Sequence, residues 1–337
     1  MLFYPLPVSI AFTESCNQLK CQFYLSRIFM AIQWFPGHMH KARKQIAEAM
    51  PQVDLVIEVL DARLPYSSEN PLIPGLLNGK PCLKLLNKMD IADPSITEQW
   101  LKYFNGLENT KAIAISGIDK KQVKLITQYC HDMLPNRRDK KQNIRTMIMG
   151  IPNVGKSTMI NTLAGRTIAK AGNLPALTRN QQHIRIDDGI VLSDTPGFLW
   201  PKIHNIASGF RLAASGAVRD TALDYYEVAD FAAEMLLEMY PEQLKERFKL
   251  DELPEKGHEV IDAIGRKRGC IKSGGHVDEY KASEILIHEL RSLKFGHISY
   301  ETPAHMIKEE ALLAETAALR ELKELEKAEK KKKKKKK

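Results

Sequence analysis

The segment that most restricts the fold is Gly150-Ile-Pro-Asn-Val-Gly155-Lys156-Ser157, which fits the pattern G-x-x-x-x-G-K-[ST]. It follows a strand-like run and precedes a segment that we expect to be helical. In such a unit the glycines let backbone N–H groups close around phosphates, and the start of the helix favours negative charge. We expect Lys156 to reach the β- and γ-phosphates and Ser157 to place its hydroxyl on Mg²⁺. The pattern predicts a phosphate-binding loop inside an α/β fold.

Short apolar runs alternate with helical stretches around this loop. The strand-like runs end at polar residues or glycine and cover residues 53–60, 82–86, 111–115 and 145–149. Helical stretches between them fall near residues 96–104 and 121–134. Such alternation predicts a mainly parallel sheet covered on both faces. Two further runs flank Asp187-Asp188-Gly189 and predict a hairpin, which brings the expected sheet to six strands.

A guanine-binding pattern, Asn87-Lys88-Met89-Asp90, directly follows the second of these runs. The Asp90 carboxylate can accept hydrogen bonds from guanine N1–H and from the exocyclic amine, a pair that adenine does not offer. A site built around such a group discriminates strongly, because the wrong base leaves a buried charge unpaired. We expect Asn87 to brace neighbouring loops, the Lys88 stem to cover the base, and a backbone N–H of Ser116-Gly117 to meet guanine O6.

A third pattern, Asp194-Thr-Pro-Gly197, ends the second hairpin strand. In phosphate-loop enzymes an aspartate at this point orients Mg²⁺, and the glycine N–H senses the γ-phosphate. D-x-x-G alone is more often a plain turn. Here, however, all three patterns follow expected strand ends, where α/β folds bind ligands. Together they predict a site for GTP and Mg²⁺.

The order of the three patterns is unusual for a GTPase. Ordinary GTPases carry the phosphate loop first and N-K-x-D later, whereas here residues 87–90 precede residues 150–157, and residues 194–197 come last. Joining the old chain ends and opening a new break preserves the sheet, since domain termini often lie close together. We therefore predict an α/β fold, a circularly permuted phosphate-loop GTPase domain followed by a smaller all-helical domain. The turn that senses the γ-phosphate then leads straight into the helical region.

The chain resembles the YlqF/RbgA family of circularly permuted, ribosome-associated GTPases over residues 30–313. The resemblance rests on Gln33-Trp-Phe-Pro-Gly-His-Met39, on Asp61-Ala-Arg-Leu-Pro65, on the permuted motifs and on Gly274-Gly-His-Val-Asp278. It implies a late step in assembly of the large ribosomal subunit, with GTP hydrolysis timing departure from the particle. With the motifs above it completes the expected GTP-binding residues, which are Asn87, Lys88, Asp90, Ser116, Gly117, Asn153, Val154, Gly155, Lys156, Ser157, Thr158, Thr178, Asp194 and Gly197.

Two positions depart from the family's pattern. The switch segment, commonly P-G-x-T, reads Pro175-Ala-Leu-Thr178 here, and we expect the alanine to stiffen that loop. Thr178 still fits the threonine that contacts Mg²⁺ and the γ-phosphate, so the expected metal ligands are Ser157, Thr178 and Asp194. Gly117 stands where alanine is usual, which is harmless for a backbone contact.

Hydrolysis needs a group that orients water, and the usual glutamine after D-x-x-G is absent. Phe198 and Leu199 stand there, so we expect slow hydrolysis unless the ribosomal particle stimulates it. The family resemblance points to His38 as the catalytic residue, since an imidazole can orient or deprotonate water near neutral pH. The alternative is a histidine that only anchors Trp34 and Phe35.

Asn153 lies inside the phosphate loop. In similar GTPases an asparagine at this point helps to hold a potassium ion, which supplies positive charge in place of an arginine finger. K⁺ is therefore a candidate second cation beside Mg²⁺. The alternative is an asparagine that simply suits a turn.

Basic residues gather in two places. Lys330 to Lys337 supply +8 of the formal net charge of +9, so the rest of the chain is close to neutral. The second group begins in residues 265–269, a stretch that we expect to be a loop. Its candidate RNA contacts are Arg266, Lys267, Arg268 and Lys272. Basic side chains on phosphates give salt-dependent affinity with little sequence preference. The alternatives are a solubilising tail without a partner and a solvated basic loop.

The chain divides by composition into four expected regions. Residues 1–29 differ in composition from the rest of the chain. They are interpreted as the result of a start codon assigned too early, as an organelle-targeting segment or as a structural arm. The regions are residues 1–29, the permuted GTPase domain 30–205, a helical RNA-binding domain 206–313, and a charged helix with the poly-lysine tail 314–337.

Composition narrows the function classes. No apolar run reaches the roughly 18 residues that a membrane-spanning helix needs. Five cysteines without a C-x-x-C pair argue against a disulfide framework or a zinc site. We expect a cytoplasmic monomer that binds GTP or GDP and the rRNA of the large ribosomal subunit. Two other functions stay open, an RNA-binding scaffold that uses GTP as a structural ligand and a permuted GTPase switch for a non-ribosomal partner.

Overall fold

The computed structural model describes residues 44–139, 142–167, 182–187, 189–195, 197, 199–200, 203, 205–218 and 224–335. All of them belong to one compact unit formed within residues 32–337. The N-terminal segment 1–29 and two expected site residues, His38 and Thr178, lie outside the described residues. Among the helices that the structure describes, none combines the length and the apolar character needed to cross a bilayer.

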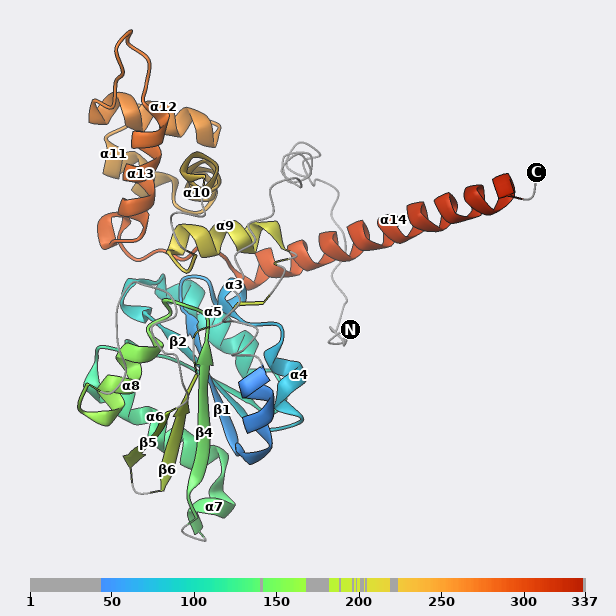
Figure 1. Ribbon diagram of the computed structural model, residues 1–337. Coiled ribbons are helices and arrows are strands. Elements are labelled where there is room, and N and C mark those ends of the chain that lie inside the picture. Colours follow the sequence, from blue (N-terminus) through green and yellow to red (C-terminus); the bar gives the residue numbers. More distant parts are fainter. Residues whose placement is uncertain are drawn as a thin grey trace. The chain divides into compact units, whose positions relative to one another are not determined.

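Six strands form one sheet in the order β3-β2-β1-β4-β6-β5 (Figure 1). Their bounds are β1 (Leu55–Asp61), β2 (Cys82–Asn87), β3 (Thr110–Ala114), β4 (Ile144–Gly150), β5 (Gln182–Asp187) and β6 (Ile190–Asp194). Neighbouring strands are parallel except β5 and β6, which form an antiparallel hairpin at one edge. The predicted mainly parallel six-stranded sheet, including its hairpin, is confirmed.

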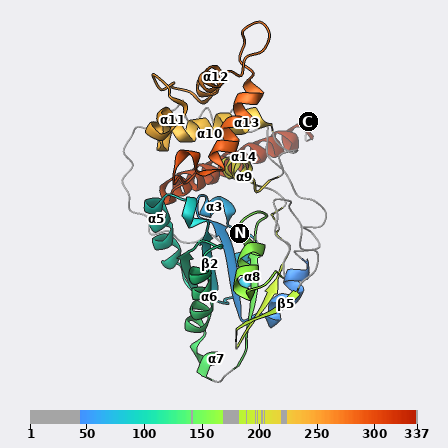
Figure 2. The same ribbon diagram turned by 90° about the vertical axis from the view of Figure 1, so that its left-hand side faces the viewer.

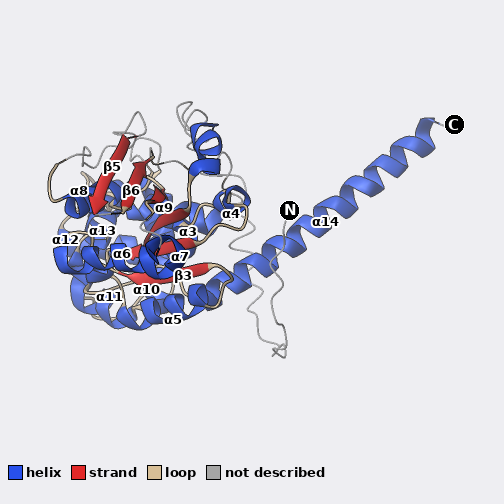
Figure 3. Cartoon of the chain, turned by 90° about the horizontal axis from the view of Figure 1, so that it is seen from below, coloured by secondary structure: helices blue, strands red, loops and turns tan. Residues whose placement is uncertain are grey.

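Helices cover both faces of the sheet. Seen from below in Figure 3, α6 and α8 lie on one side of the strands, and α4 lies on the other. All seven residues of β1 are buried, as a central parallel strand packed on both faces requires. The elements of this region, after a helix over residues 44–49, are η1 (Met50–Gln52), α3 (Pro65–Ser68), α4 (Ile73–Leu77), η2 (Met89–Ile91), α5 (Pro94–Asn105), α6 (Lys120–Met133), α7 (Pro135–Asp139) and α8 (Lys156–Ala164).

The C-terminal region is helical, as expected. α10, α12 and α13 pack on one another, and α9 packs on α10 and on α3 (Figures 1 and 2). The elements are α9 (Ile206–Ser215), α10 (Tyr225–Met239), α11 (Pro241–Phe248), α12 (Gly257–Arg268), α13 (Glu279–Leu290), η4 (Leu293–Phe295) and α14 (Pro303–Lys335). The expected solvated helix near the C-terminus is confirmed, and it continues into the lysine tail.

The prediction of a basic loop over residues 265–269 is wrong. Arg266, Lys267 and Arg268 form the last turn of α12, and Gly269 ends the helix with a left-handed φ of +68°. Cations favour a helix C-terminus because the exposed carbonyls there carry partial negative charge. Gly265 is inside the helix because a Cβ at that position would collide with the side chain of Val277. Gly265 thus allows α12 to pack closely against Val277, and Gly269 marks the end of the helix.

A short extended segment joins the helical region to the carboxyl ends of the strands. The Ile298 N–H donates to Ile91 O at 3.3 Å, and the Tyr300 N–H donates to Arg63 O at 2.6 Å. The buried Trp100 side chain on α5 donates through Nε1 to Glu301 O at 3.2 Å. Residues 298–301 therefore dock along the segments that follow β1 and β2.

Candidate nucleotide-binding site

Polar residues and a glycine follow the carboxyl ends of neighbouring strands. Because β1, β2, β3, β4 and β6 run parallel, these ends meet at one edge of the sheet, where α/β folds bind ligands. The residues at or just after the strand ends are Asp61, Asn87, Ser116, Gly150 and Asp194. Four of the five belong to the nucleotide motifs found in the sequence, and Asp61 begins the Asp61–Pro65 string, which carries the family resemblance without an expected role.

Asn87 connects the two halves of this edge. Its Nδ2 donates to Val154 O at 2.6 Å, and its Oδ1 accepts from the Gly117 N–H at 2.8 Å. A Cβ at Gly117 would lie 2.9 Å from Oδ1, and a Cβ at Gly155 would lie inside van der Waals contact of Nδ2. The amide therefore fits between two glycines and links the loops that follow β2, β3 and β4.

The phosphate-loop segment, residues 150–157, joins the end of β4 to the first turn of α8, and the predicted strand before it and helix after it are both present. Gly155 precedes α8 with φ +92°, a conformation that glycine adopts without strain. The buried Lys156 side chain donates through Nζ to Asp194 Oδ1 at 3.2 Å and to Thr195 O at 2.6 Å. A Cβ at Gly197 would lie 3.2 Å from the Cα of Pro152. The D-x-x-G turn therefore adjoins the phosphate loop.

The base-recognition loop presents Asp90 at the surface. Asp90 is exposed and is the second residue of η2. Lys88 directly precedes η2, and its backbone is left-handed with φ +66°. Lys88 Nζ donates to Asp61 Oδ2 at 2.8 Å. Asp61 therefore fixes the amine of the side chain whose stem we expect beneath the base.

The loop after β3 differs in detail from the expectation. The Ser116 N–H donates to Gln122 Oε1 at 2.7 Å, and the Gly117 N–H is the one that donates to Asn87. Both backbone donors proposed for guanine O6 are thus engaged within the protein. A bound base would share the Gly117 N–H with the Asn87 side chain.

The comparisons with known proteins assign the family. A family model described as "50S ribosome-binding GTPase" matches residues 145–267. Ribosome biogenesis GTPase A of Priestia megaterium is 45% identical, over 82% of this chain and 98% of that protein. The Bacillus cereus protein of the same name is 46% identical, over 81% of this chain and 95% of its own. The chain belongs to the ribosome biogenesis GTPase A (YlqF/RbgA) family.

Solved structures agree with this assignment. GDP-bound YlqF covers 77% of this chain and 99% of its own, with a TM-score of 0.57 and 26% identity. The GNP-bound YlqF from Thermotoga maritima gives a TM-score of 0.54 at the same identity, over 78% of this chain and 98% of its own. The chain is accordingly a circularly permuted GTPase, which hydrolyses GTP. The family model begins at β4, the strand before the phosphate loop, and leaves residues 87–90 outside its range.

Two of the expected metal ligands lie within the described residues. Ser157 stands in the first turn of α8, and the buried Asp194 ends β6. Within the described residues of the chain, no group of three or more His, Cys, Asp or Glu side chains could hold a metal ion. A hydroxyl, one carboxylate and nucleotide phosphates are nevertheless a donor set that suits Mg²⁺, which usually binds with its substrate's phosphates. The roles of Thr178 and His38 stay predictions.

Asn153 has a contact that the sequence did not suggest. Its backbone is left-handed with φ +61°, and its Nδ2 donates to Gly216 O, the C-cap of α9, at 2.8 Å. The phosphate loop thus touches the first helix of the C-terminal region. The potassium site proposed for this side chain stays a prediction.

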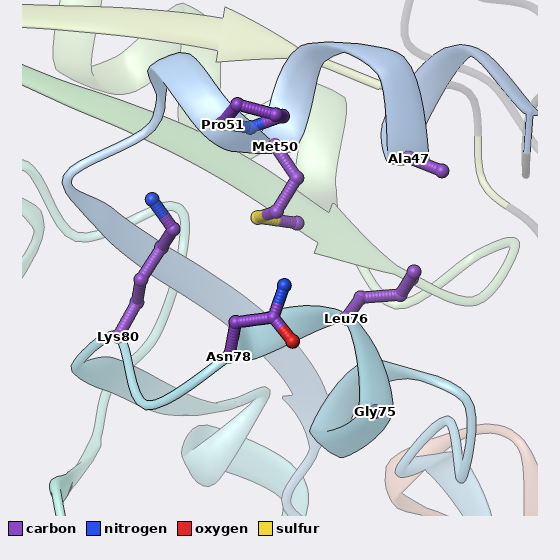
Figure 4. Close-up of a pocket in the computed structure, with 7 residues that line it drawn as sticks. All are labelled: Ala47, Met50, Pro51, Gly75, Leu76, Asn78 and Lys80. Atoms are coloured by element: carbon purple, nitrogen blue, oxygen red, sulfur yellow. The ribbon is translucent and has the colours of Figure 1, made fainter.

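A surface cavity of about 430 Å³ lies elsewhere on the molecule. Figure 4 shows the Met50 side chain facing Asn78 and Lys80 across it. η1 and Lys80 come just before β1 and β2, so this cavity lies at the amino ends of those strands. None of the predicted site residues lines it, and we do not assign it to the nucleotide.

The four candidate RNA contacts all form ion pairs at the surface. Arg266 pairs with Asp262 at 2.7 Å, Lys267 with Asp251 at 2.8 Å, Arg268 with Glu289 at 3.0 Å and Lys272 with Asp278 at 3.4 Å. Exposed pairs of this kind stabilise a fold only weakly, because solvent screens the two charges. The cations are therefore present at the surface but are locally neutralised.

Replacing Gly155 and Gly117 by alanine tests the role of Asn87. Gly155→Ala forces a Cβ into a left-handed residue and into the Asn87 amide, so we expect GDP affinity to fall roughly tenfold or more. Gly117→Ala only moves the far end of Asn87, and we expect a change of less than about threefold by the same reasoning. Titration with a fluorescent GDP analogue measures both. Equal affinities in the two variants would contradict this description of the site.

Proposed function

We propose that this chain binds the large ribosomal subunit and promotes a late step of its maturation, with GTP hydrolysis timing its release. The observation that carries the proposal is 45% identity across 98% of a protein named Ribosome biogenesis GTPase A. The description of the matching family model, which names 50S ribosome binding, supports the large subunit as the partner.

In this proposal the nucleotide exchanges partners with the buried Lys156–Asp194 pair. Lys156 leaves Asp194, 3.2 Å away, and turns to the β- and γ-phosphates. Mg²⁺, when bound, supplies positive charge against the same phosphates. Asp194 is then free to orient the metal. Each buried charge keeps an opposite charge throughout, which avoids the large cost of an unpaired buried ion.

The γ-phosphate controls the helical region through the turn that ends at Gly197. From there the chain runs through the buried residues Leu199 and Ile203 into α9. α9 packs against α3 and α10, and Asn153 of the phosphate loop contacts its C-cap. Loss of the γ-phosphate thereby releases contacts on both ends of α9. Such order changes around a γ-phosphate are a common switch in GTPases.

The helical region, 206–313, carries the RNA-facing surface in this proposal, beside the GTPase domain 30–205 and the tail 314–337. On contact, rRNA phosphates replace the carboxylates that now pair with Arg266, Lys267, Arg268 and Lys272. Each exchange replaces a weak, exposed ion pair with a carboxylate by an equally weak pair with a phosphate, so the pairs themselves add little affinity. The affinity comes instead from the counterions that the RNA releases. Specificity then depends on RNA shape.

One observation favours a rival function, an RNA-binding scaffold with GTP as a structural ligand. Phe198 and Leu199 follow the D-x-x-G motif, and neither side chain can hydrogen-bond the attacking water. Hydrolysis then depends on a group from elsewhere, and we assign that role to His38. A scaffold would bind GTP and the particle without turnover that depends on the particle.

Cosedimentation with purified large ribosomal subunits tests the main proposal. We expect the chain to sediment with the subunits in a non-hydrolysable GTP analogue, to stay in the supernatant in GDP, and to hydrolyse GTP faster when subunits are added. ATP should support none of this, because adenine cannot satisfy Asp90. Particle-independent turnover, or equal sedimentation in both nucleotides, is the outcome that contradicts the proposal.

His38→Ala should lower GTP turnover on the particle by a factor of about 10² to 10⁴, the usual contribution of a general base. Affinity for a non-hydrolysable GTP analogue should stay within twofold, roughly, because the imidazole acts on water and not on binding. Single-turnover hydrolysis with the particle bound measures the first effect. Normal hydrolysis by the variant would end the proposal for His38.

Two variants separate the α12 surface from the tail. Replacing Arg266, Lys267 and Lys272 by alanine should weaken rRNA binding and reduce the salt slope of log K by roughly 0.7–0.9 per lost phosphate contact. Deleting residues 330–337 should weaken binding mainly at low salt, since a run of lysines acts through long-range attraction that salt screens. Filter binding across a salt series measures both. Unchanged binding at low ionic strength in either variant contradicts its role.

A further inference from the structure

The Asp61 carboxylate is a buried junction between two cations. Asp61 Oδ1 accepts from the Arg63 N–H and from Arg63 Nε, both at 3.0 Å, and Oδ2 accepts from Arg63 Nη2 at 2.8 Å. Oδ2 also accepts from Lys88 Nζ at 2.8 Å. Burial raises the pKa of Asp61, but the Arg63 and Lys88 charges outweigh it, so its pKa lies well below the ordinary value. The carboxylate is therefore ionised and holds Lys88.

Arg63 has a second partner from the far end of the chain. Its Nη1 donates to Tyr300 Oη at 3.0 Å, and its guanidinium lies 5.2 Å from the centre of the Tyr300 ring. The Tyr300 N–H donates back to Arg63 O at 2.6 Å, and Tyr300 Oη donates to Leu290 O at the end of α13, 3.2 Å away. Tyr300 thus contacts both the guanidinium and the backbone carbonyl of Arg63.

The segment 61–68 fastens the next residue as well. Glu301 accepts from the Ser67 N–H at 2.9 Å and from the Ser67 hydroxyl, and it pairs with Arg211 of α9 at 3.2 Å. One side of this segment therefore faces the base-recognition loop, and the other faces α9 and the extended residues before α14. All these side chains are buried.

We propose that Arg63 and Tyr300 are positioning residues for guanine recognition. Tyr300 holds the Arg63 guanidinium, Arg63 holds the Asp61 carboxylate, and Asp61 holds Lys88, two residues before Asp90. This inference rests on the proposed binding of guanine by Lys88 and Asp90. It assigns a role to the Asp61-Ala-Arg-Leu-Pro65 string, which sequence reasoning left without one.

The route differs from the γ-phosphate switch in what it senses. Lys88 contacts the base, which GDP and GTP share, whereas Gly197 faces the γ-phosphate. The end of α13 and the base-recognition loop are consequently coupled in either nucleotide state. Because coupling is reciprocal, a partner that acts on the helical region through this route also changes the strength of the base contacts, which GDP and GTP share. Any difference between the two nucleotides then comes from the γ-phosphate switch.

Tyr300→Phe is the direct test, because it removes the hydroxyl and keeps the ring. We expect the dissociation constant for GDP and the KM for GTP to rise together, roughly threefold to tenfold, the scale typical of residues that act through another. kcat should stay unchanged, since contacts to the base are equal in the ground and transition states. A lower kcat at constant KM would instead indicate a loss of folded protein and would overturn the proposal.

Tyr240→Phe is the matched control. Tyr240 is also buried, and its hydroxyl accepts from the Ser299 N–H at 2.9 Å and donates to Asp93 Oδ2 at 3.2 Å. It therefore fastens the same extended segment without contacting Arg63, Asp61 or Lys88. We expect a similar fall in melting temperature and unchanged GDP affinity. Equal losses of GDP affinity in the two variants would show a general effect of loosening the segment and would overturn the proposal.

A double-variant cycle tests whether the route runs through Lys88. Lys88→Met keeps an aliphatic stem over the base and removes the amine, so Tyr300→Phe should add little to its effect on GDP affinity. Independent, additive effects would contradict the route.

Arg63→Lys is a second variant if Tyr300→Phe fails to fold, because one ammonium cannot reach both Asp61 oxygens and Tyr300. Unchanged GDP affinity in that variant counts against the proposal. If the unaltered protein bound ADP as tightly as GDP, that result would refute the proposed recognition of guanine by Lys88 and Asp90 instead.

Discussion

The site depends on one side-chain amide. Asn87 donates to the phosphate loop at Val154 O and accepts from the base loop at Gly117, so it fixes the distance between the two ends of a nucleotide. Side-chain amides can donate and accept at once, which no carboxylate or ammonium can do. Glycines on both sides leave room for it. The link matters because the chain that joins Gly117 to the phosphate loop passes through α6, α7 and β4.

Buried charge at this edge is arranged in pairs that can exchange partners. Lys156 pairs with Asp194, and Asp61 lies between Arg63 and Lys88. Burying an ion without a partner costs several kcal/mol, so such groups fold only as sets. The first set is positioned to open toward phosphates and metal. In the second set both cations, Arg63 and Lys88, stay paired with the Asp61 carboxylate. This set therefore positions side chains and does not exchange partners.

Local patterns predicted the strands, the hairpin and the motifs, because apolar runs and turn residues act over a few neighbours. Asn87, Lys156 and Asp194 lie where strand ends placed them. The contact between Arg63 and Tyr300 spans 237 residues and has no local signature. The sequence does not predict the last turn of α12, because Gly265 and Gly269 are indistinguishable by local pattern although the first permits close packing and the second ends the helix. The pairing of Lys267 with Asp251 likewise depends on tertiary packing.

The strand order also fixes a sequence of events during synthesis. β1, β2 and β3 lie side by side in the sheet and leave the translating ribosome first, complete with the loops for the base. The phosphate loop follows β4, and the metal-side aspartate comes only at the end of β6. A domain generally folds as a unit, so a growing chain that still lacks β4 and β6 has neither the complete sheet nor the groups that grip a triphosphate. Nucleotide capture is therefore postponed until Asp194 has been added, and an unfinished molecule cannot trap GTP.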